Sequence, residues 1–249
     1  MRRELCCVGR RFARIEGFVA SIAGAFALSG CYPTLHTPFA EGTEVLEAGK
    51  VGLTVVGGGG YAQTNQPGTQ PTLGTGFGGL EARVRVGVGA KQELGASFLA
   101  AVGSAQSGGD PPFDVGGAIT YKIAPVQWFA LVADAGVLDV NAASIVTWSG
   151  DVAAIFAPYT AKDGSQLYTG ARGGFAISML TNQNAHAVSE AVTVPVGYAL
   201  QLSERSRLMF EGGFVLGFTQ LTHELTPAVT DNYTSYGGYG VVGFRYVFN

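Results

Sequence analysis

The sequence has few cysteines and few charges, and both shortages narrow what the protein can be. Its cysteines, Cys6, Cys7 and Cys31, all precede residue 32 of a chain of 249 residues. The remaining chain therefore has neither a disulfide framework nor a cysteine metal site. Only 13% of residues are charged, the formal net charge is −3, and no cluster of Lys and Arg occurs after residue 14. This charge pattern argues against nucleic-acid binding.

Long hydrophobic runs are also missing once the N-terminal region is set aside, although the mean hydropathy is positive at +0.25. A spanning helix needs a stretch of about 18 or more apolar residues, so the body of the chain contains no candidate. Glycine is abundant instead, with 38 residues. Hydrophobicity is thus spread over many short segments, which is how a β-barrel meets a lipid bilayer.

Alternation of apolar with polar or small residues is the dominant pattern in the body of the chain. Residues 80–89 read LEARVRVGVG, apolar at every even position and charged or glycine at every odd one. Successive strand residues point to opposite faces, so one face is apolar and the other is polar. The recurrence of this pattern predicts ten strands, at residues 50–61, 77–89, 92–104, 113–123, 128–138, 144–157, 166–179, 189–202, 207–219 and 236–248.

The connections between these segments predict a single transmembrane, antiparallel, up-and-down β-barrel over residues 50–249, with eight strands as the main alternative to about ten. Short connections largely alternate with longer polar ones, as in bacterial barrels. The long loops 62–76 and 220–235 are the predicted contact surface for an extracellular ligand, because function concentrates in loops on a rigid scaffold. Pro195 cannot donate to a strand ladder and predicts a bulge or local kink in its strand.

Aromatic residues gather near the predicted strand ends, as expected of two belts at the membrane interfaces. One predicted belt contains Tyr61, Phe77, Phe113, Trp148, Phe218 and Tyr236, and the other contains Tyr121, Trp128, Phe156, Tyr246 and Phe248. The last strand resembles the C-terminal assembly signal of outer-membrane proteins, although Asn249 follows Phe248. This resemblance implies outer-membrane lipid and the barrel-assembly machinery as partners. Residues 50–249 resemble, in pattern, the small outer-membrane β-barrel proteins of Gram-negative bacteria, and the resemblance names no activity.

The N-terminus has the layout of a secretory signal peptide over residues 1–30. A basic leader precedes the apolar stretch 18–28, which is too short for a comfortable span. Leu28-Ser29-Gly30-Cys31 resembles the bacterial lipobox, in which the cysteine thiol is diacylated and the chain is cut before it. The resemblance implies lipidation of Cys31 and a lipid-anchored tether over residues 31–49. The alternative is an ordinary signal peptide with a coincidental cysteine near its cleavage site.

Charged residues of both signs fall on the inward face of the predicted strands. In a narrow barrel such charges pair across the interior, because each desolvated ion needs a partner to offset its lost hydration. We therefore predict a largely plugged lumen and a structural or surface-binding role. The predicted lumen network consists of Glu81, Arg83, Arg85, Glu93, Asp114, Lys122, Asp134, Asp151, Arg172, Glu211 and Arg245.

Three other functions remain open as alternatives: a small passive porin, a soluble periplasmic β-sandwich lipoprotein, and an outer-membrane hydrolase with a histidine at its rim. His36, His186 and His223 stand apart, and their spacing to acidic and serine residues matches no hydrolase motif. The glycine run at 57–60 lacks the Lys-Ser/Thr of a phosphate loop. We therefore expect no catalysis, no cofactor and no metal.

Lipidation of Cys31 is testable by metabolic labelling with palmitate. If the thiol carries the lipid, Cys31→Ala removes the label from the protein, because no other group can accept the diacylglycerol. Undiminished label on the variant would rule the lipidation out.

Overall fold

The structure, a computed structural model, describes residues 40, 42–65, 73–103, 113–140, 145–180, 185–223 and 229–248. Among these residues no helix is long and apolar enough to cross a membrane. The described residues form ten strands: β1 (Val51–Asn65), β2 (Leu73–Gly89), β3 (Gln92–Gly103), β4 (Phe113–Val126), β5 (Phe129–Val140), β6 (Ile145–Thr160), β7 (Gln166–Leu180), β8 (Ala185–Ser203), β9 (Ser206–His223) and β10 (Val229–Phe248).

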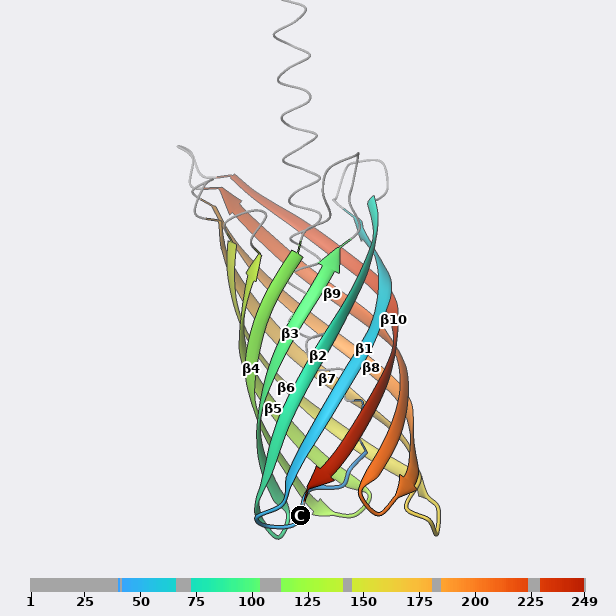
Figure 1. The fold of residues 1–249 in the computed structure, drawn as a ribbon. Coiled ribbons are helices and arrows are strands. Elements are labelled where there is room, and N and C mark those ends of the chain that lie inside the picture. Colours follow the sequence, from blue (N-terminus) through green and yellow to red (C-terminus); the bar gives the residue numbers. More distant parts are fainter. Residues whose placement is uncertain are drawn as a thin grey trace, which may run out of the picture.

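The ten strands close into a single antiparallel barrel (Figure 1). Each strand pairs with its neighbours in sequence, and β1 closes the sheet by pairing with β10 from Val51↔Phe248 to Asn65↔Thr234. Closure leaves no strand edge unpaired, which is what a sheet needs in a medium without water. The predicted up-and-down β-barrel is confirmed, with ten strands instead of eight.

The outer face of the barrel is apolar. Along β8 the outward side chains of Val192, Val194 and Val196 are 51%, 49% and 57% exposed, while the residues between them are buried. Exposed Val, Leu, Ile and Phe recur on every strand. A soluble protein rarely exposes so continuous an apolar surface, whereas hydrocarbon stabilises it. The barrel therefore spans a lipid bilayer.

Several strands are longer than predicted, by the largest amounts at the end opposite the C-terminus, whereas β4 and β6 each extend by three residues at the C-terminal end. β8 begins at Ala185 instead of residue 189, and β10 begins at Val229 instead of residue 236. These extensions are rich in Thr, Asn, Gln and Ser, which indicated loops in the sequence but continue the ladder above the apolar band. Residues 62–65, 73–76, 220–223 and 229–235 of the two predicted ligand loops are therefore strand. Residues 66–72 and 224–228 lie outside the described residues.

No bulge occurs at Pro195. Pro195 pairs with Gly213 of β9, and the register to β7 is the same on either side of it, with Thr169↔Val196 and Arg172↔Thr193. The β7 ladder lacks the pairs between these two positions, and the Thr169 hydroxyl donates to the Pro195 carbonyl at 2.8 Å. The missing N–H thus interrupts the pairing without shifting the register.

Of the predicted belt residues, Phe77 is wrongly assigned. Its side chain points inward and packs against two buried clusters of the inner wall, which contain Leu99 and Tyr239. Phe77 and the inward Glu81 both stand at odd positions of β2, and odd positions of this strand face the lumen. The alternation along β2 therefore predicts an inward Phe77. The Phe113 side chain lies outside the described residues. The other predicted belt residues that are at least 38% exposed are Tyr61, Tyr121, Trp128, Trp148, Phe156, Phe218, Tyr236 and Phe248.

An outward charge tests the membrane-facing surface. Val196→Arg, placed in the middle of the apolar band of β8, is expected to lower the free energy of unfolding by about 2–4 kcal/mol. Thr230→Arg, on the polar outer extension of β10, is the control and should cost at most about 1 kcal/mol. Unfolding by denaturant in lipid vesicles measures the free energy of unfolding of both variants. Equal losses would contradict the assignment of the Val196 face to the lipid-facing surface.

Candidate functional site: the lumen and its plug

All eleven side chains of the predicted lumen network lie on the inner wall, and none is more than 8% exposed. Most of them belong to three groups of contacts in the half of the barrel near the C-terminus and at mid-height. Asp114 lies apart, close to the opposite end of the barrel, and its Oδ1 has no hydrogen-bond partner among the described residues. No ion pair of Arg245 is identified among the described residues.

The first group holds two carboxylates together through one guanidinium. Asp134 on β5 and Asp151 on β6 are directly opposite each other in the sheet. Like charges in such a pair repel. Arg172 on β7 forms ion pairs of 2.6 Å with each carboxylate, and all three side chains are at most 8% exposed. The arginine therefore makes this arrangement of two adjacent acids stable in the interior.

The second group lies at the junction of β2, β3 and β4. Arg85 and Glu93 form an ion pair of 2.7 Å, and the Lys122 ammonium lies 3.9 Å from the same Glu93 oxygen. On the same face of β2, Arg83 pairs with Glu81 at 2.7 Å. Buried charges of both signs are thus paired along the inner wall, within β2 and between the neighbouring strands β2, β3 and β4.

The third group surrounds Glu211 on β9. The hydroxyls of Tyr168 and Tyr239 donate to its carboxylate at 3.0 and 2.8 Å. Each tyrosine ring lies over a glycine: a Cβ added at Gly197 would be 2.2 Å from the Tyr168 ring, and one added at Gly213 would be 2.5 Å from the Tyr239 ring. These glycines are needed because only a residue without a side chain leaves room for the rings.

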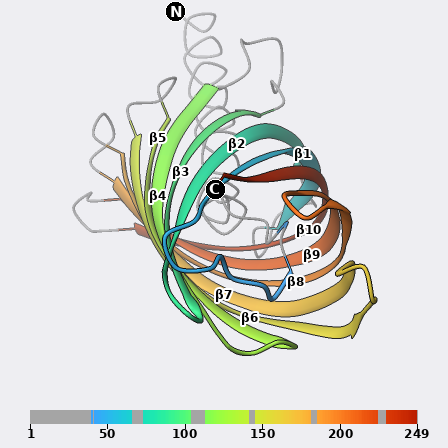
Figure 2. The ribbon, with the colours of Figure 1, turned by 60° about the horizontal axis from the view of Figure 1, so that its bottom comes forward.

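Residues 40 and 42–46 lie inside the mouth of the barrel at the C-terminal end, and the exposed residues 47–49 lead from there to β1. We call residues 40 and 42–49 the plug segment. Figure 2 shows this segment in blue, crossing the opening. Val45 packs against a buried cluster of the inner wall, and Leu46 is 3% exposed. Residues 40 and 42–46 of the predicted tether 31–49 therefore belong to the interior of the barrel. Cys31 lies outside the described residues.

Buried wall side chains hold the plug segment mainly by its backbone. Glu211 accepts the N–H of Ala40 at 2.8 Å, and Glu93 accepts the N–H of Leu46 at 2.9 Å. The amide oxygen of Gln166 accepts the N–H of Thr43 at 3.2 Å. Lys122 donates to the carbonyls of Gly42 and Glu44 at 2.9 and 2.7 Å. The lumen charges thus pair with one another and with the plug.

One lumen charge was not among the predicted residues. Arg207 on β9 is 7% exposed and forms an ion pair of 2.5 Å with Glu44 of the plug segment. Arg207 and Glu211 both stand at odd positions of β9, which face the lumen. The alternation along β9 therefore predicts that Arg207 points inward. Its partner Glu44 lies outside any alternating segment, and no sequence pattern indicated that contact.

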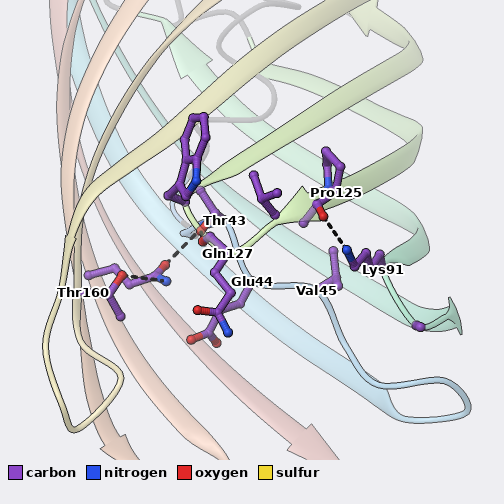
Figure 3. A pocket seen from close by; sticks show the side chains of 12 residues that line it. Thr43, Glu44, Val45, Lys91, Pro125, Gln127 and Thr160 are labelled. Carbon is purple, nitrogen blue, oxygen red and sulfur yellow. Dashed lines mark hydrogen bonds between the residues drawn. The ribbon is translucent and has the colours of Figure 1, made fainter.

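A cavity of about 740 Å³ opens beside the plug segment at this mouth (Figure 3). Its walls include residues 43–45 and the turns that join β2 to β3 and β4 to β5. The Thr43 hydroxyl donates to the Gln127 carbonyl, and the Lys91 ammonium donates to the Pro125 carbonyl. The plug therefore fills the mouth only in part and leaves one side accessible.

Toward the opposite end the inner wall becomes apolar. A buried cluster there contains Leu99, Leu138, Ile145, Leu221 and Tyr233. His186 and His223 lie near the same end, on β8 and β9. Within the described residues, no three side chains of His, Cys, Asp or Glu are arranged to hold a metal ion. The charged chemistry of the lumen is therefore concentrated near the plug.

Comparisons with known proteins show likeness in architecture alone. No family profile matches the chain, and no curated protein matches its sequence. Similar solved structures include the translocator domain of the autotransporter NalP from Neisseria meningitidis, at 9% identity and a TM-score of 0.48, covering 91% of this chain and 97% of that one. An outer membrane channel from Pseudomonas putida F1 has 11% identity and a TM-score of 0.45, covering 83% and 98%. The outer membrane protease OmpT from Escherichia coli has 10% identity and a TM-score of 0.38, covering 83% and 100%.

At these similarities no activity or ligand carries over to this chain. The location rests on the barrel itself: a closed antiparallel sheet with a continuous apolar exterior and a polar interior is the form in which chains cross the bacterial outer membrane. The protein is an outer-membrane β-barrel.

The Arg172 group provides a test of the paired lumen. Arg172→Gln leaves Asp134 and Asp151 adjacent and without their cation, and is expected to lower the free energy of unfolding by about 3–5 kcal/mol. A triple variant that adds Asp134→Asn and Asp151→Asn removes the unpaired charges and should recover most of this loss. Denaturant unfolding in vesicles measures both variants. An unchanged free energy of unfolding for Arg172→Gln would contradict the ion pairing.

Proposed function

We propose that the protein is an outer-membrane barrel closed by its plug segment, with a structural or surface-binding role and no catalytic activity. The observation that carries the proposal is the occupation of the lumen near the C-terminal end. The plug backbone is bound there by Glu93, Lys122, Gln166 and Glu211. Arg83, Arg85 and Arg172 form ion pairs with acidic side chains of the wall. A barrel filled in this way offers solutes no wide path.

The proposal includes an anchor and a contact surface. A lipid on Cys31, nine positions before Ala40, would enter the inner leaflet beside the mouth that the plug occupies. Partners outside the cell would meet the polar strand extensions and the loops 66–72 and 224–228 between them. Outer-membrane lipid and the barrel-assembly machinery complete the proposed partners.

The second candidate is a small passive porin, and one observation favours it. Several buried side-chain atoms of the lumen, among them Glu81 Oε1 and Thr193 Oγ1, have no hydrogen-bond partner among the described residues. Such atoms are normally bonded to water when buried. If water fills the lumen at mid-height, only the plug segment and the paired charges beside it would close the path for solutes.

Planar-bilayer recording separates the two candidates. The pure protein should give no steady single-channel steps, because the plug and the ion pairs fill the narrow lumen. Deletion of residues 40–48 should produce stepwise conductance, since it removes the backbone that occupies the mouth beside Lys122, Glu93 and Glu211.

Two controls accompany the recording. Glu47→Gln changes only an exposed surface pair with Lys50 and should leave the barrel closed. Unboiled samples of every variant should migrate differently from boiled samples in electrophoresis, which shows that the barrel has folded. Steady steps from the unaltered protein would favour the porin and defeat the proposed closure.

A further inference from the structure

Most hydrogen bonds between the plug segment and the wall are made by its main chain. Its side chains add the Thr43–Gln127 hydrogen bond, the Glu44–Arg207 ion pair and the burial of Leu46. Three N–H groups, those of Ala40, Thr43 and Leu46, reach wall acceptors on Glu211, Gln166 and Glu93. Two carbonyls, those of Gly42 and Glu44, accept from Lys122. Every peptide offers these groups, whatever its side chains.

The wall groups that make these contacts are built into the interior. Lys122 is fully buried, Glu93 is 1% exposed, Gln166 is 2% exposed and Glu211 is 5% exposed. Arg85 and the tyrosines at 168 and 239 hold the two carboxylates in place independently of the plug. A buried polar group that loses its partner is costly, so this end of the lumen requires an occupant or water.

Two close approaches restrict which segment fits. A Cβ at Gly42 of the plug would lie 1.8 Å from the Gln166 amide oxygen. A Cβ at Gly87 of the wall would lie 2.1 Å from the Glu47 carbonyl oxygen. The site therefore takes a backbone that lies directly against the wall at these two positions. Charged side-chain recognition is limited to the Glu44–Arg207 pair.

We propose that the lumen at the C-terminal end is a binding site for a polypeptide main chain, and that the plug segment is its exchangeable resident occupant. A second polypeptide segment can replace the resident, entering through the accessible side of the mouth beside residues 43–45 (Figure 3). This inference rests on the proposed function, because it identifies the kind of partner that the closed site accepts.

The test uses synthetic peptides and the barrel that lacks residues 40–48. A fluorescein-labelled peptide AEGTEVLEAG, which copies residues 40–49, should bind in a fluorescence anisotropy titration and block the conductance. Methylation of the peptide nitrogens at the positions of Thr43 and Leu46 should weaken binding by about tenfold or more, because each lost N–H leaves a buried acceptor without its donor.

Side-chain variants of the peptide form the matched controls. A peptide in which the exposed Glu47 becomes Ala should bind within a fewfold of the parent, whereas one with Leu at the Gly42 position, which lies against Gln166, should bind more weakly. The proposal is overturned if the methylated peptide binds as well as the parent, or if the alanine peptide loses binding altogether.

A full-chain comparison covers the case in which the deleted barrel fails to fold. Leu46→Pro removes the N–H that Glu93 accepts, while Leu46→Ala removes the side chain and keeps the N–H. The proline variant should open the channel and the alanine variant should stay closed. Equal behaviour of the two variants would refute recognition of the main chain.

The two proposals fail in distinguishable ways. If the barrel without residues 40–48 binds the peptide but does not conduct, the proposed closure by the plug is wrong and the binding site stands. If it conducts but does not bind the peptide, the closure stands and the binding site is wrong.

Discussion

Closure of one sheet without an edge is the constraint on which the structure depends. In hydrocarbon every backbone N–H and C=O must find a partner within the protein, and the pairing of β1 with β10 provides the last set. Once the cylinder is closed, each strand must turn one face to lipid and the other to a narrow interior. The alternation of the whole chain and the crowding of charge inside both follow from this.

Closure of the barrel confines charged side chains in a narrow interior, where other groups of the protein must compensate them. Charges confined to a narrow lumen lose much of their hydration and must be compensated by one another. Arg172 compensates Asp134 and Asp151, and Arg85 compensates Glu93. Wall groups that are not fully used in such pairs are completed by the plug backbone, as Lys122 is by two carbonyls. The plug is therefore part of the electrostatic balance of the lumen as well as a physical obstruction.

The alternation of apolar with polar or small residues along each strand predicts most of the fold. Parity alone placed Glu81, Arg83 and Arg85 inside and Val84 and Val86 outside, because a strand residue has only two directions to point. It also placed Arg207 and Phe77 inside, although the first was overlooked and the second was assigned to a belt on its aromatic character. Strand ends were harder to predict, since Thr, Asn and Gln continue a ladder as well as they form loops once the neighbouring strand supplies the partners.

The barrel, the apolar exterior, the inward position of the charges and the approximate number of strands follow from the amino-acid pattern, because each of these depends on the period of two along a single strand. Three features appear only in the folded chain: which charges meet, that Tyr168 and Tyr239 hold Glu211, and that the plug segment enters the lumen. These contacts join residues as far apart as Ala40 and Glu211. Such pairs depend on how the closed sheet brings distant strands face to face, and the plug contacts involve backbone groups that every residue possesses and no pattern distinguishes.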